Sequence, residues 1–65
     1  MLYFHDLDAL PEEDQALVNK ANGPQMEPYE VDELKEQAIT DRAREMLERI
    51  SSHKYHMEEL RCGMV

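Results

Sequence analysis

Apolar side chains in the first third of the chain share one face of a helix: Leu10, Leu17, Val18 and Ala21. Their spacing predicts a helix over about residues 10–21. Pro11 suits the first turn of this helix, and Asp8 is its expected N-cap. The sequence Asn-Gly-Pro at 22–24 combines residues that tolerate a left-handed backbone with a helix breaker, so we expect the helix to end there.

A second helical pattern follows the connector at 22–28, and no Gly or Pro interrupts it between Tyr29 and Arg61. Pro28 is expected at the start of this element. Its apolar positions alternate in steps of four and three, which is the seam of a helix packed on another helix, as in a coiled coil. The predicted seam consists of Ile39, Ala43, Met46, Ile50, His53, Met57, Leu60 and Met64, widened by Leu34 and Leu47.

The element over about 29–61 is either one long helix or a broken pair. An uninterrupted helix of this length would be about 50 Å long, whereas the helix over 10–21 would cover about 18 Å of it. Ser51–Ser52 is the weakest point, because serine is a poor residue for a helix interior. The seam is therefore expected either to fold back at these serines or to pair with a second copy in a homodimer.

The apolar start of the chain, residues 1–5, has two interpretations. It could be a short strand, but nothing else in the sequence reads as its strand partner, so we expect an arm that docks on the helices. The predicted fold is all-α: an N-terminal arm, a short helix and a long helix or broken pair. At 65 residues the chain is expected to form a single small domain, 1–65.

Charge is distributed unevenly along the chain. Residues 1–36 hold ten acidic residues and two lysines, which accounts for the whole net charge of −8, while residues 37–65 hold five of each sign. Direct nucleic-acid binding needs clustered Lys and Arg, and anionic lipid repels an acidic surface, so we expect neither. An acidic surface instead favours a protein partner with a basic face.

The expected partner-binding face is acidic and lies on two helices: Glu12, Glu13, Asp14, Glu30, Asp32, Glu33 and Glu36. Three interpretations compete for these carboxylates. They form a merely solvated surface, a docking face for a basic protein, or a mimic of nucleic acid that occupies a phosphate-binding site. Inhibitors made by phages and other mobile elements use the last mode.

The stretch "HKYHMEELRC" raises the question of a metal or a nucleophile. His53 and His56 are three residues apart, but Cys62 lies about 180° round the same helix from His53, so the three do not converge. Cys62 also follows two glutamates close to the chain end, which disfavours a reactive thiolate. We predict no metal site, no cofactor and no catalytic residues.

These patterns predict a non-catalytic protein that binds and modulates, most simply inhibits, a partner protein through its acidic face. The alternative is an accessory subunit, such as an antitoxin or adaptor, that binds one obligate partner through the apolar seam. The methionines of the seam fit either an ordinary core or an adaptable docking surface. The sequence shows neither a secretory signal nor a membrane span, and its single cysteine is compatible with a cytoplasmic protein.

Overall fold

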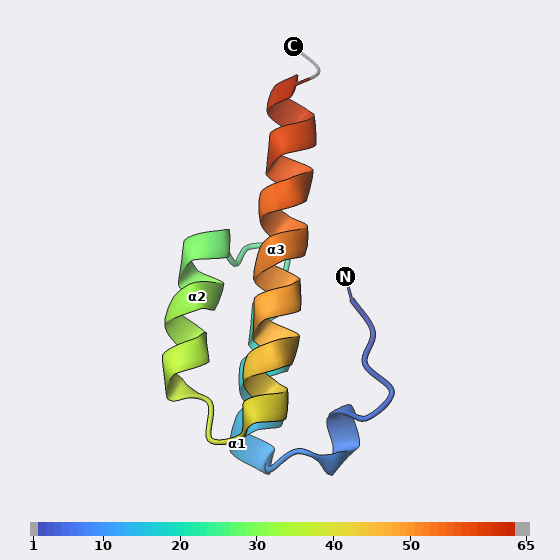
Figure 1. Cartoon of the computed structure of the whole chain (residues 1–65), viewed down its shortest axis with the longest axis vertical. Coiled ribbons are helices and arrows are strands. Elements are labelled where there is room, and N and C mark those ends of the chain that lie inside the picture. Colours follow the sequence, from blue (N-terminus) through green and yellow to red (C-terminus); the bar gives the residue numbers. More distant parts are fainter. Residues whose placement is uncertain (1, 64–65) are drawn as a thin grey trace.

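The computed structural model describes the backbone of residues 2–63 and the side chains of residues 2–58. Within that range the chain has a 3-10 turn, η1 (Leu7–Ala9), and three helices, α1 (Glu12–Ala21), α2 (Pro28–Gln37) and α3 (Asp41–Gly63). The all-α prediction is confirmed. The helices run up, down and up, and α3 packs against both of the others (Figure 1).

Helix α1 agrees with the predicted span, but its two ends are built differently from the prediction. Asp8 lies in η1, and the residue preceding the helix is Pro11, which makes no side-chain cap. At the other end Asn22 is right-handed, with φ −74° and ψ −9°, and Gly23 also has no positive φ. Main-chain bonds from Asn22 to Val18 and from Gly23 to Lys20 close the last turn without a left-handed residue.

The connector between α1 and α2 is held from a distance by Lys54 of α3. Its Nζ donates to the carbonyl oxygens of Gly23 at 2.9 Å and Met26 at 2.8 Å. Helix α2 then begins at Pro28, as predicted, because proline fixes a helical φ and lacks only an N–H that would be unpaired there.

The second helical element breaks at residues 38–40 and not at Ser51–Ser52. Ala38 is extended, with ψ 138°, and ends α2. Thr40 precedes α3, and its Oγ1 accepts a hydrogen bond from the Ala43 N–H at 3.2 Å, which is the bond of a threonine N-cap. Ser51 is buried inside α3, where its hydroxyl donates to Asp32 Oδ1 of α2 at 2.7 Å. This partner satisfies the serine, so the helix continues through it.

The core lies where the three helices meet, along the first half of α3. Its buried members are Leu10, Val18, Ala21, Val31, Leu34, Ala38, Ala43, Met46, Leu47 and Ile50. Each fully buried large apolar side chain contributes about 1.5–3 kcal/mol. Helix α3 has 23 residues against 10 in each of the others, so its second half extends beyond them (Figure 1).

The N-terminal segment docks on this core, as predicted, and forms no strand within residues 2–63. Leu2, Phe4 and Leu7 are partly buried against the core. Figure 1 places the segment beside α3, on the side away from α2.

Candidate partner-binding surface

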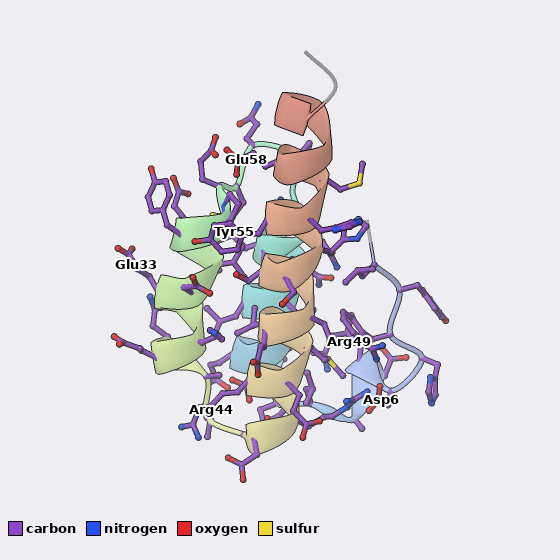
Figure 2. The ribbon with its side chains drawn as sticks, turned by 45° about the horizontal axis from the view of Figure 1, so that its top comes forward. Asp6, Glu33, Arg44, Arg49, Tyr55 and Glu58 are labelled. Atoms are coloured by element: carbon purple, nitrogen blue, oxygen red, sulfur yellow. The ribbon has the colours of Figure 1, made fainter. Side chains whose placement is uncertain are left out.

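The outer side of α2 carries three glutamates of the predicted site. Val31, Leu34 and Ala38 turn into the core, so the opposite side of the helix faces solvent. That side, which we call the acidic face of α2, consists of Tyr29, Glu30, Glu33 and Glu36. Glu33 and Glu36 are exposed and Glu30 is half-buried. Figure 2 shows Glu33 pointing away from α3.

The pKa of Tyr29 is raised by the negative charges around this face. The phenol is 59% exposed, and the charge of Glu30, together with burial and the charges of Glu27 and Glu33, raises the pKa of Tyr29 above its usual value. The charges of three carboxylates, Glu27, Glu30 and Glu33, therefore act on one exposed aromatic ring. An exposed tyrosine among carboxylates offers both cation–π contact and ion pairing to an incoming Arg or Lys.

Asp32 differs from its neighbours on α2 because it is committed to α3. Its Oδ1 accepts from Ser51 at 2.7 Å and lies 3.3 Å from Lys35 Nζ, and its Oδ2 accepts from Tyr55 at 3.4 Å. The hydrogen bond from Ser51 is the main cause of the lowered pKa of Asp32. The structure therefore places Asp32 as a link between two helices, which corrects its assignment to a free acidic face.

Asp14 is the second correction. It was expected on the exposed face, but its side chain is fully buried. Its Oδ1 accepts from the Ile39 N–H at 2.9 Å, and its Oδ2 accepts from the Thr40 N–H at 3.0 Å and the Thr40 hydroxyl at 2.7 Å. Burial raises the pKa of Asp14, but these hydrogen bonds outweigh it and lower the pKa below its usual value.

Glu12 and Glu13 are exposed in the first turn of α1. The start of α1 lies at the same end of the molecule as the end of α2 (Figure 1). These two glutamates therefore lie near the Glu36 end of α2 and away from the Glu30 end. The seven predicted acidic residues do not form one continuous face.

The predicted seam divides into three parts. Ala43, Met46 and Ile50 are buried within the chain's own core. Ile39 is 62% exposed in the break between α2 and α3, so it is not on the seam helix, and the correction follows from the N-cap at Thr40. His53 and Met57 are exposed on the part of α3 that extends beyond the other helices. Leu60 and Met64 lie outside the described side chains.

A groove of about 380 Å³ lies between the connector and this part of α3. Met26, Ile50 and Met57 supply apolar walls, and His53 and Lys54 supply polar ones. The seam beyond Ile50 is a signal for this groove in the sequence, but the contribution of Met26 depends on the connector folding back over α3. This groove is a second candidate surface. It carries less charge than the acidic face of α2, and its apolar walls include the methionines Met26 and Met57.

The two histidines singled out in the sequence lie near the end of the described side chains of α3. His53 and His56 are both exposed, and Cys62 lies outside the described side chains. Within the described residues no three His, Cys, Asp or Glu side chains are grouped as metal ligands.

Comparison with known protein families, with curated proteins and with solved structures finds no match to this chain. Among the helices that the structure describes, none is both long and apolar enough to cross a membrane.

Proposed function

We propose that this chain is a non-catalytic protein that binds a basic surface of a partner protein through the acidic face of α2. The observation that carries the proposal is the grouping of Glu30, Glu33 and Glu36 with Tyr29 on a side of α2 that the rest of the molecule does not use. The one basic residue of α2, Lys35, is paired with Asp32. The face therefore presents carboxylates without a neutralising cation from its own helix.

Inhibition is the simplest consequence of such binding. Carboxylates at successive turns of a helix occupy the positions that phosphates would take on a nucleic-acid-binding protein, so the proposed partner is of that class and the chain competes with its nucleic acid. Asp14 is buried and Asp32 is hydrogen-bonded to α3. This role therefore rests on two separate groups of carboxylates, one on α2 and one in the first turn of α1, and not on one continuous face. A cytoplasmic location is part of the same proposal.

The test uses two matched charge reversals. Glu33→Lys changes the acidic face, and Glu48→Lys makes the same charge change at an exposed position of α3. A tagged full-length chain is used to capture proteins from extracts of its own cells at low salt, and the captured protein is then titrated with each purified variant. We expect Glu33→Lys to weaken binding while Glu48→Lys leaves it close to wild type. Association of the wild type should slow as ionic strength passes about 0.15 M, where the Debye length is about 8 Å.

Three outcomes contradict the proposal. One is equal binding by both reversals, which makes the charge a solvated surface only. Another is binding that does not respond to salt. The third concerns inhibition: if saturating chain leaves the nucleic-acid binding of the captured protein unchanged, the chain does not act as a nucleic-acid mimic.

The accessory-subunit function remains the second candidate, and the exposed end of the seam favours it. Met57 is 53% exposed beside the groove at the connector. A partner held there should be lost with Met57→Asp and retained with Glu33→Lys, and its binding should resist salt.

A further inference from the structure

The connector between α1 and α2 has little packing of its own. None of residues 22–27 is buried, and of their apolar side chains Met26 packs against the core. Its internal hydrogen bond runs from the Met26 N–H to the Gly23 carbonyl oxygen at 3.2 Å. Segments with few buried contacts are the ones that open while the rest of a protein stays folded. The connector therefore depends on contacts from elsewhere in the fold to stay closed.

Lys54 of α3 supplies such a contact. Its Nζ donates to the carbonyl oxygens of Gly23 at 2.9 Å and Met26 at 2.8 Å, which are the two ends of the turn in the connector. In the part of the chain that the structure describes, no other side chain forms a hydrogen bond with residues 23–27. Hydrogen bonds from a charged donor are roughly twice as strong as neutral ones. One ammonium group therefore fastens the whole turn to α3.

The connector is also one wall of the groove at the second half of α3, which continues past it (Figure 1). That wall is formed by Pro24, Met26 and Pro28, and the opposite wall includes Ile50 and Met57. Ile50 is 1% exposed and belongs to the core, so the groove reaches the core at this residue. Movement of the connector away from α3 would therefore widen the groove and uncover Ile50.

We propose that the connector is a strap fastened by the ammonium of Lys54, and that release of this ammonium opens the strap while the three helices stay folded. The open form exposes apolar surface at Met26 and Ile50 that the closed form covers. The charge on Lys54 therefore controls the width of the groove, and Lys54 is a positioning residue that acts through the connector. The strap uses no residue of the acidic face of α2, so it stands apart from the function proposed for that face.

The experiment compares Lys54→Met with Lys20→Met in the full-length chain. Methionine keeps an unbranched side chain and removes the ammonium, and Lys20 is exposed in the last turn of α1, close to the connector. Hydrogen exchange is followed by nuclear magnetic resonance at the Met26 N–H and, as a reference in the core of α3, at the Leu47 N–H. We expect Lys54→Met to lower the protection of Met26 relative to Leu47 at least about tenfold, as expected for loss of a charge-assisted hydrogen bond. Lys20→Met should leave this ratio as in wild type.

Two further measurements report on the open form. In wild type, exchange of the Met26 N–H should depend less on added urea than exchange of the Leu47 N–H, because opening of the strap exposes less surface than unfolding of the chain. Nile red, a neutral apolar dye, should fluoresce more strongly with Lys54→Met than with wild type or Lys20→Met, because the open strap uncovers Ile50. Circular dichroism establishes whether each variant retains its helices.

The proposal is overturned if Lys54→Met lowers the protection of Met26 and Leu47 by the same factor, because Lys54 then stabilises the whole fold and fastens no separate strap. Unchanged protection at Met26 also overturns it. If Lys54→Met does not fold, the wild-type measurement decides, and equal urea dependence of exchange at Met26 and Leu47 rejects the strap. None of these results involves Glu33 or Met57, so the two candidate binding functions are tested independently.

Discussion

Asp14 Oδ2 lies 2.7 Å from the Thr40 hydroxyl, although the two residues are 26 positions apart in the chain. The same carboxylate accepts the main-chain N–H groups of Ile39 and Thr40, and the Thr40 hydroxyl in turn accepts from Ala43. An acidic side chain of α1 therefore fixes the turn between α2 and α3 and the first turn of α3. The negative charge of Asp14 also lies near the positive N-terminal end of the α3 dipole, which is a stabilising arrangement.

Replacing Asp14 should destabilise the fold. In Asp14→Ala the part-buried N–H groups of Ile39 and Thr40 lose their acceptor, so we expect the free energy of unfolding to fall by about 2–3 kcal/mol. Urea unfolding followed by circular dichroism measures it. The control Glu13→Ala removes an exposed carboxylate from the same turn and should change stability by less than about 0.5 kcal/mol. Equal effects of the two changes would show that Asp14 acts only as one more surface charge.

The pH dependence of stability follows from the same carboxylate. Hydrogen bonds hold the pKa of Asp14 below its usual value despite burial. The contact with Arg42 lowers the pKa of Asp6, and the hydrogen bond from Ser51 lowers the pKa of Asp32. A carboxyl whose folded pKa is depressed contributes stability above its unfolded pKa, about 3.9, and loses that contribution as pH falls through the folded pKa. Stability should therefore decline below about pH 4.

Asp14→Asn provides the matching measurement. The amide has similar shape but does not ionise in this range, so the variant should be less stable at neutral pH and should lose less stability on acidification. Urea titrations repeated from neutral to acid pH give both slopes. A variant with the same acid slope as wild type would assign the pH dependence to Asp6 and Asp32 instead.

Local signals gave the helix class and several boundaries correctly. The arm, the span of α1 and the start of α2 at Pro28 each depend on a few neighbouring residues, and sequence carries such information well. The heptad pattern runs across residues 38–40 because Ile39 falls in register by spacing alone. Thr40 followed by Asp41 is an N-cap signal in the sequence, and it marks the observed start of α3.

The errors at Asp14, Asp32 and Ser51 share one cause. Their neighbours in the sequence suggest an acidic first turn for Asp14, an acidic face for Asp32 and a helix-weakening residue for Ser51. In the structure each of them instead makes a hydrogen bond with a residue at least 19 positions away. Tertiary hydrogen bonds of this kind leave no periodic trace in a sequence. The same holds for Lys54 of α3, whose Nζ holds the connector through the carbonyl oxygens of Gly23 and Met26.

Self-association is a separate prediction, and the structure narrows where it would occur. Helix α2 joins α1 in covering Ala43, Met46 and Ile50, so the homodimer expected from the seam depends on its exposed end at His53 and Met57. We expect a dimer at micromolar concentration that Met57→Asp dissociates without loss of helicity. Ile50→Asp should instead unfold the chain, because it buries a charge in the core.

Sedimentation equilibrium and circular dichroism on the two variants distinguish these effects. Wild type that sediments as a monomer at all concentrations tested would remove the dimer. A dimer that survives Met57→Asp would place the contact elsewhere on the molecule.

The titration of Tyr29 tests the acidic face directly, before any partner is known. Because the charge of Glu30 is the largest cause of the raised pKa of this phenol, Glu30→Gln should move the Tyr29 pKa back toward about 10. Carbon-13 labelling of the tyrosine ring resolves Tyr29 from Tyr3 and Tyr55 in a magnetic resonance titration. Glu48→Gln, which removes a charge from α3, should leave the Tyr29 pKa unchanged.

A basic partner that engages the face should also lower this pKa, since a cation beside the ring favours the phenolate. A partner that binds tightly and leaves the Tyr29 pKa as it is in the free chain must be held elsewhere, as at the groove beside Met57.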